Sequence, residues 1–467
     1  MNNQLRTFFR PTVVDNLGVR QDLDAMLPGM FLEQFSSTLL DNINIVVTGF
    51  IGTAAIAGVG QISTINNTLM IVFQSFAVGG TALVAQAAGA GRRAEGHKTA
   101  GAALLSGGLL GVLLAAALFF FRVPLIVLLF GEAGAEVVEN SIIYYTYTAL
   151  APPMWFIYFQ CCGFMRSCGD TRRPMVVSVF SNILGIVCNL LFTFLLHMGV
   201  AGAGLSYILS VSGGAVVALA MVMRPDFPAR PYLRIDPEAV RQARQVCRIG
   251  VPSSLENLMF NGTRLVIQIF LASMGAVVIS ANQVYNSATN VLLIPFMSIN
   301  FLTASVTGRC AGRGGVQAVR PCVEYLSRKG RAYAVLTGAA TILFALPLAG
   351  IFCRDRLVLP SAVGMLVLYA LFMPFLSGCF ILPNAFKAVG DAKFSMYVSS
   401  LSAWTFRVMG MWLLGVVLGW GAIAIVLTQG MDHIARCLIY KKRFAGQCWL
   451  NNCRPSGQER TAYERDL

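Results

Sequence analysis

A succession of long apolar stretches, each able to cross a bilayer as a helix, is the feature that most constrains this chain. A spanning helix needs about 20 mostly apolar residues, and only short connections separate the stretches. Only 12% of the residues are charged, about half the share in a soluble domain. The predicted spans are residues 24–48, 56–86, 99–121, 137–160, 174–197, 201–223, 246–273, 281–308, 332–353, 357–382, 394–417 and 421–440. The sequence therefore predicts an all-α integral membrane protein with twelve transmembrane helices.

The basic residues alternate along the chain, and this pattern predicts the topology. Most of the 35 lysines and arginines fall near the termini and in every second loop, as expected for cytoplasmic segments. The clusters are Arg92, Arg93 and Lys98; Arg166, Arg172 and Arg173; Arg224 to Arg248; Arg309 to Arg331; Lys387 and Lys393; and Arg436 to Arg465. We expect both termini in the cytoplasm, a multi-pass protein of the plasma (inner) membrane, and contact with anionic lipid rather than nucleic acid.

The sequence has no motif for nucleotide hydrolysis, metal binding or catalysis. No Gly-Lys-Ser/Thr follows the Gly-rich stretch before Arg92, so no phosphate loop is expected. His97, His197 and His433 are far apart, and the cysteines lack zinc spacing. We expect neither an enzyme nor a protein with a cofactor or a bound metal. The N-terminus has no apolar core with a cleavage site, so no cleaved signal peptide is expected.

The chain contains an internal repeat. "GFMRSCGDTRRPM" (163–175) recurs as "NAFKAVGDAKFSM" (384–396), and the offset stays between about 221 and 223 residues elsewhere. Two halves of six helices each would be parallel repeats, related by an axis along the membrane normal, as in some secondary transporters. The predicted organisation is an N-terminal segment 1–23, an N-lobe 24–224, a cytoplasmic linker 225–244, a C-lobe 245–441 and a cytoplasmic tail 442–467, the two pseudo-symmetric bundles enclosing a central cavity.

The first helices of the two halves align, but their charges diverge. "FLEQFSSTLLD" (31–41) lies over "SLENLMFNGTR" (254–264), so Glu33 matches Glu256 and Asp41 matches Arg264. Charges at membrane depth cost about 2.5–3.5 kcal/mol and usually have a function. The pseudo-symmetry is therefore broken where a functional site is expected.

Asp41 is the strongest candidate for a coupling residue. Loss of water disfavours a charged carboxylate, so a deep aspartate is expected to exchange a proton in the physiological range. The alternative is a structural polar group, hydrogen-bonded to neighbours. Glu33 and Glu256 are weaker candidates for the same role. Arg264 and Arg407 are candidate counter-ions, gate residues or substrate contacts.

Amide side chains on apolar helices are candidates for the lining of a wet central cavity. Each of them is also explained by interhelical hydrogen bonding. The candidate cavity residues are Gln34, Asn66, Asn67, Gln283, Asn286, Asn290, Arg264 and Arg407.

"GDTRRPM" after the fourth span, its echo "GDAKFSM", the Asp41 helix and "GVAGAGLSYILS" resemble the multidrug and toxic compound extrusion (MATE) transporters. The resemblance covers essentially the whole chain. It implies two six-helix lobes around a central cavity and export of amphipathic, often cationic, drug-like compounds in exchange for protons or sodium. It also implies a monomer.

The resemblance also implies which residues hold the coupling cation. An aspartate in the first helix is a cation-site residue in many bacterial members, and Asp41 matches it. Where those members carry an asparagine and an aspartate in the fifth helix, this chain has Gly185 and Asn189, with Asn182 one turn earlier. The second carboxylate is thus an amide. A single deep acid favours proton coupling through Asp41 over sodium coupling.

Two other functions fit parts of the sequence. A lipid-linked oligosaccharide flippase of the same superfamily would need a cationic cavity, and Arg264 and Arg407 would suit it. A non-transporting scaffold or channel-like membrane protein would need no titratable site.

Overall fold

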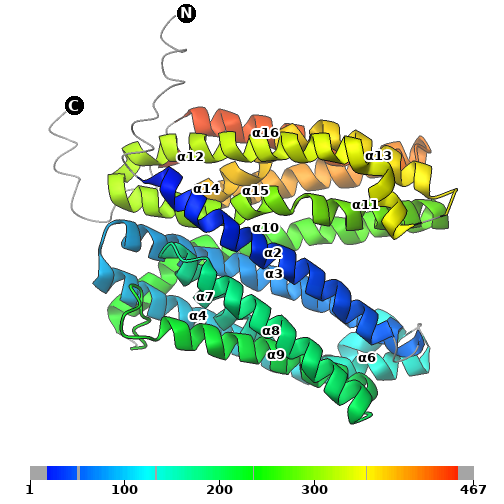
Figure 1. The fold of residues 1–467 in the computed structure, drawn as a ribbon, viewed down its shortest axis with the longest axis horizontal. Coiled ribbons are helices and arrows are strands. Elements are labelled where there is room, and N and C mark those ends of the chain that lie inside the picture. The colour runs from blue at the N-terminus through cyan, green and yellow to red at the C-terminus, as the bar shows by residue number, and fades with distance from the viewer. Residues whose placement is uncertain are drawn as a thin grey trace, which may run out of the picture. The chain divides into compact units, whose positions relative to one another are not determined.

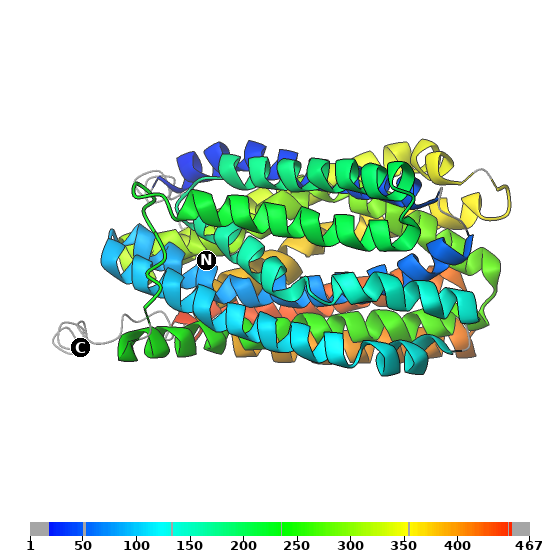
Figure 2. The same ribbon diagram turned by 90° about the horizontal axis from the view of Figure 1, so that it is seen from below.

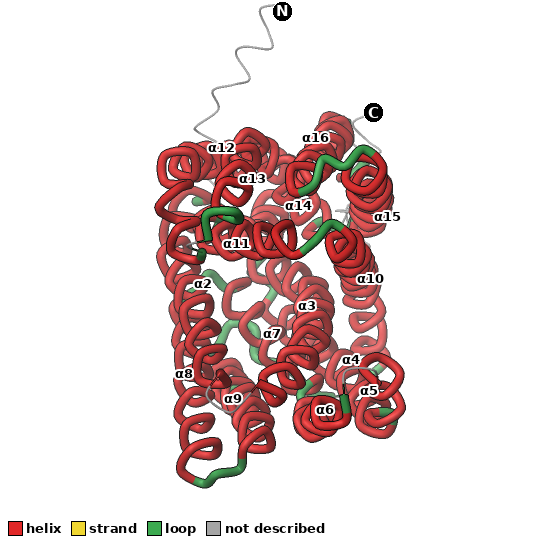
Figure 3. The backbone as a smooth tube through the Cα atoms, turned by 90° about the vertical axis from the view of Figure 1, so that its right-hand side faces the viewer, coloured by secondary structure: helices red, strands yellow, loops and turns green. Residues whose placement is uncertain are grey.

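The computed structural model describes residues 18–49, 53–131, 134–234, 236–353, 355–446 and 448–450; its description of side chains leaves out residues 39–49, 53–57 and 194. The described residues are helices joined by short loops, without a strand among them (Figure 3). They form two compact units. The N-terminal unit comprises Met26–Ala88 and Arg92–Ser254, and the C-terminal unit comprises the remainder.

The helices of the N-terminal unit follow the predicted spans, with extra breaks. In Figure 1, α7, α8 and α9 run alongside one another. The predicted span 137–160 is divided into α6 and α7 by a turn at residues 149–151. The elements are α2 (Val19–Gly49), α3 (Thr53–Gly89), α4 (Arg93–Phe120), α5 (Arg122–Phe130), α6 (Ala135–Thr148), α7 (Pro152–Ser167), α8 (Arg172–Leu190), the π-helix η3 (Leu191–Leu195) and α9 (Gly199–Val222).

The C-terminal unit contains more irregular helices. Three π-helical segments and one 3₁₀ segment interrupt its later spans, and Figure 2 shows the orange and red helices of this part from below. The elements are α10 (Pro237–Ser273), α11 (Ala276–Leu292), α12 (Ile294–Phe352), α13 (Leu359–Phe372), η4 (Met373–Phe375), η5 (Ser377–Ile381), α14 (Leu382–Ala388), α15 (Ala392–Ser402), η6 (Ala403–Met409), η7 (Trp412–Val417) and α16 (Ala422–Ala445).

Seven described helices are long and apolar enough to cross a membrane, or eight when the pair Leu359–Phe375 and Ser377–Ala388, bent by 58°, counts as one span. The helix α12 contains the end of one predicted span and nearly all of the next. Gly314 and Gly315 have non-helical backbone angles and form a kink between these two parts. The exact number of twelve spans remains a prediction. The all-α membrane fold with repeated halves is confirmed.

Two helices are shared between the units. The first turns of α2 belong to the C-terminal unit, where Asp22 forms ion pairs with Arg309 at 3.4 Å and Arg313 at 2.7 Å. The first half of α10 belongs to the N-terminal unit, where Lys98 pairs with Glu238. This helix starts at Pro237 rather than at residue 246, so it includes the end of the predicted linker.

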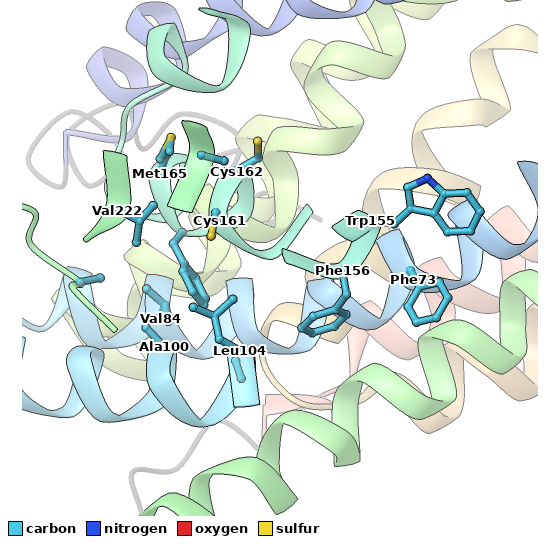
Figure 4. Close-up of a cluster of buried hydrophobic side chains, with 14 of the residues drawn as sticks. Phe73, Val84, Ala100, Leu104, Trp155, Phe156, Cys161, Cys162, Met165 and Val222 are labelled. Atoms are coloured by element: carbon cyan, nitrogen blue, oxygen red, sulfur yellow. The ribbon is translucent and has the colours of Figure 1, made fainter. Parts of the chain in front are cut away.

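Small residues allow close helix packing in the N-terminal unit. The ring of Phe156 on α7 lies directly on Gly107 of α4, where an added Cβ would meet ring carbons at 1.7–2.1 Å. One turn later on α4, the backbone of Pro153 packs against Gly111. Small residues four apart are a common means of close approach between membrane helices. Figure 4 shows Phe156 beside Phe73 in the buried cluster, and their ring centroids are 6.5 Å apart.

The repeat is visible in the backbone itself. The turn after α7 contains Gly169 with φ +92°, and the equivalent turn after α14 contains Gly390 with φ +93°. Side chains other than glycine rarely adopt these angles. The two Gly-Asp motifs therefore form the same left-handed turn in both halves.

We expect Gly390→Ala to destabilise the protein by about 1–2 kcal/mol, because alanine at a left-handed φ carries that steric cost. Thermal unfolding followed by tryptophan fluorescence in detergent would measure the loss. Gly364→Ala is the control, because an added Cβ there meets nothing within 4 Å. Equal melting temperatures for the two variants would contradict the proposed role of the turn.

Candidate ion and substrate sites

Glu33 is buried in the N-terminal unit and carries an ion pair. It lies on α2 with 4% of its surface exposed. Its Oε1 is 2.5 Å from Nη2 of Arg166, near the end of α7. The pair ties the first helix of the repeat to the helix that ends in the Gly-Asp turn.

Glu256 makes the equivalent pair in the C-terminal unit. Its Oε2 lies 2.9 Å from Nζ of Lys387 on α14. The hydroxyl of Ser399 donates to its Oε1 at 2.8 Å, and that hydroxyl lies 2.7 Å from the hydroxyl of Tyr440. Glu256 and Lys387 are both buried. Burial of both charges makes each partner dependent on the other.

These two ion pairs are related by the repeat and correct one part of the sequence interpretation. Arg166 and Lys387 are 221 residues apart, within the offset of the repeat. The sequence interpretation assigned both to cytoplasmic loops as markers of topology, and that assignment is wrong for these positions. Each lies within a helix and neutralises a buried glutamate.

Arg407, a predicted cavity residue, is buried in a network with α16. Its Nε donates to Oδ2 of Asp432 at 2.7 Å, and its Nη2 lies 3.2 Å from Nε2 of His433. Arg436 donates to the same Oδ2 at 2.8 Å, and the Ser402 hydroxyl donates to Oδ1 at 2.6 Å. Asp432 and His433 are fully buried, with 0% exposure. Arg407 is therefore a counter-ion within its own unit.

Arg264, the residue aligned with Asp41, is exposed on α10. Its guanidinium carbon lies 5.9 Å from the centre of the Phe260 ring, one turn earlier on the helix. None of the described carboxylates forms an ion pair with it. Exposure and an unneutralised charge are consistent with a contact to a ligand.

Asp41 lies in α2, but its side chain is outside the described residues. Of the other coupling candidates, Asn189 is buried, with its Oδ1 accepting a hydrogen bond from Thr193 at 2.9 Å. Asn182 is half-buried and its Nδ2 is 3.5 Å from the Ser178 hydroxyl. The roles of these three residues in coupling remain predictions.

The predicted cavity amides separate into two groups. Gln283, Asn286 and Asn290 are all exposed and share one face of α11 at the spacing i, i+3, i+7. On α3, Asn67 is exposed, whereas Asn66 is buried and its amide atoms have no hydrogen-bond partner among the described groups.

Gln34 on α2 is half-buried. The clearest of the predicted polar faces is on α11, because its three amides, Gln283, Asn286 and Asn290, lie on one exposed side of a single helix.

The sequence interpretation did not identify Arg166, Lys387, His433 and Arg436 as parts of the buried charge networks. The repeat carried a signal for the first two, because a basic residue stands three positions before each Gly-Asp motif. For α16 a signal was the spacing of Asp432 and Arg436, which are four residues apart and so share a helix face.

We expect Asp432→Asn to destabilise the protein by about 3–5 kcal/mol, because it leaves two buried arginines without their carboxylate. Chemical unfolding in detergent would measure the loss. The control is Glu324→Gln, whose pair with Arg320 is exposed and is worth about 0–1 kcal/mol. Similar losses in the two variants would contradict the importance of the network.

A double-mutant cycle on Glu256→Gln and Lys387→Met tests the second ion pair. We expect each single variant to be strongly destabilised and the double variant to be more stable than the sum of the two losses predicts, by about 0.5–3 kcal/mol. The same cycle on Glu33→Gln and Arg166→Met should give a coupling of the same sign. Additive losses in both cycles would show that the pairs are not energetically coupled.

Comparison with known proteins places the chain in a family. The MatE family model matches twice, at residues 29–191 and 252–413. These two matches cover the two halves of the internal repeat.

Relatives and solved structures agree with this result. The uncharacterized transporter YisQ of Bacillus subtilis (strain 168) is 24% identical over 434 residues, covering 90% of this chain and 93% of that protein. A probable multidrug resistance protein NorM of Thermotoga maritima is 26% identical over 369 residues, covering 77% of this chain and 78% of that protein. A variant of the Vibrio cholerae MATE transporter VcmN shares the fold, with a TM-score of 0.84 and 21% identity over 94% of this chain and 100% of that structure.

The family matches account for the main features of the sequence and the fold. They explain the apolar helices, the repeated Gly-Asp turn and the paired glutamates of the two first helices as parts of one duplicated unit. Because the model matches both halves and most of the length, this multi-pass membrane protein belongs to the MATE family of transporters.

Proposed function

We propose that the protein is a secondary active multidrug exporter that moves amphipathic, drug-like compounds, including organic cations, out of the cell in exchange for protons. Family membership and the relatives named as multidrug resistance proteins support this proposal. Sodium is the alternative coupling ion. Transport would alternate between two access states, with the two repeats on either side of the substrate.

The assignment of the coupling residue rests on one observation: the buried acids form ion pairs with basic residues. Glu33, Glu256 and Asp432 each have a carboxylate oxygen within 3 Å of a cationic nitrogen, from Arg166, Lys387 and Arg407 respectively. Each of these carboxylates is engaged in an ion pair between helices, and breaking such a pair costs stability. This favours Asp41 over Glu33 and Glu256 as the coupling residue.

The mechanism follows from the electrostatics of a deep carboxylate. Protonation of Asp41 would neutralise a desolvated charge, allow α2 to repack and lower the affinity for a cationic substrate. Competition between proton and substrate would make the exchange obligatory. Each proton moving inward across 100 mV supplies about 2.3 kcal/mol, enough for a concentration ratio of roughly fifty.

The proposal extends to the cellular setting. The protein would act as a monomer in the plasma (inner) membrane, with both termini in the cytoplasm and with lipid and small molecules as its partners. The distribution of basic residues supports this orientation, although Arg166, Lys387 and Arg436 no longer count toward it.

We expect proton-driven efflux of ethidium from liposomes to be lost in Asp41→Asn, because an amide cannot take up or release the coupling proton. Proton and sodium gradients would be imposed separately and efflux followed by fluorescence. The control is Asp24→Asn, because Asp24 is an acid on the same helix and its side chain is about half exposed. Efflux that persists in Asp41→Asn under a proton gradient would show that another residue couples transport to protons. Efflux driven only by a sodium gradient would show that sodium is the coupling ion.

A further inference from the structure

Three arginines surround a single aromatic ring in the C-terminal unit. The guanidinium carbons of Arg407, Arg436 and Arg264 lie 4.5, 5.6 and 5.9 Å from the centre of the Phe260 ring. These residues come from three elements, η6, α16 and α10. We call Arg264, Arg407, Arg436 and Phe260 the basic cluster.

Among the described carboxylates, only Asp432 forms ion pairs with members of the basic cluster. Both oxygens of Asp432 accept short hydrogen bonds, Oδ1 from Ser402 and Oδ2 from Arg407 and Arg436. Its single negative charge is shared between Arg407 and Arg436, and none of the described carboxylates pairs with Arg264. Three arginines and one aspartate leave the cluster with an excess of two positive charges among the described residues, which is costly at membrane depth.

Two buried hydrogen-bond donors, one in the basic cluster and one next to it, also lack acceptors among the described groups. The Nε2 atom of His433 faces a guanidinium N–H of Arg407, so Nε2 accepts and the ring proton is on Nδ1. Neither this Nδ1 nor Nε of Arg436 has a hydrogen-bond partner among the described groups. Unpaired buried donors are rare in native proteins. An excess of both charge and donors indicates a site that accepts an anionic group.

The N-terminal unit is built differently at the equivalent positions. Ser181, the counterpart of Ser402, exchanges hydrogen bonds of 2.8 and 2.7 Å with Ser210, the counterpart of Asp432. Gly185 and Gly214 stand near the positions that correspond to Arg407 and Arg436, and a Cβ added at either would meet a serine oxygen within 2.9 Å. The charged cluster is therefore specific to the second repeat rather than part of the shared scaffold.

The backbone at Arg407 is also unusual. Arg407 lies in the π-helix η6, Ala403–Met409, and the offset of the repeat changes from 221 at Ser402 to 222 at Asp432. A π-bulge accommodates one extra residue in a helix and occurs frequently at functional sites. The extra residue changes the direction of Arg407, which reaches both Asp432 and Phe260.

We infer that the basic cluster binds an oxyanion, such as a carboxylate or phosphate group, on an amphipathic ligand. Arg264 is the accessible contact, since it is exposed and its planar guanidinium suits bidentate binding of oxyanions. Arg407 and Arg436 supply the positive field behind it. The inference rests on the proposed export function and specifies its substrates, which would include amphipathic anions and zwitterions.

Titration calorimetry on the purified full-length protein in a non-ionic detergent would test this site. The probes are 2-naphthoate, its neutral amide 2-naphthamide and the water-soluble lipid dihexanoyl-phosphatidylglycerol. We expect wild type to bind at least one of the two anions. If it binds naphthoate, it should bind the neutral amide at least about tenfold more weakly, because a charge-assisted hydrogen bond is worth that ratio or more. Binding of naphthoate points to a soluble amphipathic anion, and binding of the lipid alone points to a headgroup.

Variants identify the residue responsible. Arg264→Gln should weaken anion binding at least about tenfold, and Arg264→Lys should bind with intermediate affinity because it keeps the charge without the planar fork. Arg248→Gln, which removes an exposed cation from the same helix outside the cluster, should bind as wild type does. Size-exclusion profiles would confirm that each variant is folded.

The inference is overturned if wild type binds neither anion, if it binds naphthoate and naphthamide equally, or if Arg264→Gln binds the anion as wild type does. Proton-driven ethidium efflux by the same wild-type preparation reports the export function separately. Efflux without anion binding would refute the site and leave the export function standing. Anion binding without efflux would support the site and count against the proposed export of cations.

Discussion

The neutralisation of charges inside an apolar helix bundle is the constraint on which this structure depends. Two ion pairs, Glu33 with Arg166 and Glu256 with Lys387, join the first helix of each repeat to the helix before its Gly-Asp turn. Removing one partner of a buried pair costs about 3–5 kcal/mol. The pairs therefore require that each first helix and its turn-bearing helix remain together within their own repeat.

The two repeats share this framework but differ in the chemistry that it supports. Both contain the left-handed Gly-Asp turn and the glutamate pair. In the second repeat Asp432 and Arg436 on α16 meet Arg407 on η6, whereas the first repeat has serines and glycines at the corresponding positions. The candidate coupling residue Asp41 lies in the first repeat, and the basic cluster lies in the second.

Much of the fold could be predicted from the sequence, because helix length and apolarity have a direct physical cause in the bilayer. The repeat, the position of most helices and the burial of Glu33, Glu256 and Arg407 all follow from apolar runs and aligned motifs. The partners of these charges could not be predicted in the same way. Arg166 and Lys387 stand near the ends of apolar runs, where a basic residue usually marks a loop, and only their three-dimensional contacts show that they pair with buried glutamates.

The breaks within helices were also beyond the reach of the sequence pattern. Hydropathy is averaged over a window, so it does not distinguish one straight span from α6 and α7, or from α13 followed by η4, η5 and α14. The π-helix at Arg407 has no compositional signal at all. For Asp41 the sequence remains the source of the assignment, since its side chain lies outside the described residues.

The close contacts at Gly185 and Gly214 limit how the two halves could have diverged after duplication. A guanidinium at either position would have to displace the serine pair that holds α8 against α9. A variant with arginine at both positions of the first half would therefore lose the hydrogen bonds between Ser181 and Ser210, and with them a contact between α8 and α9. The second half holds Arg407 and Arg436 without that cost, because Asp432 takes the place of a serine there and pairs with both arginines.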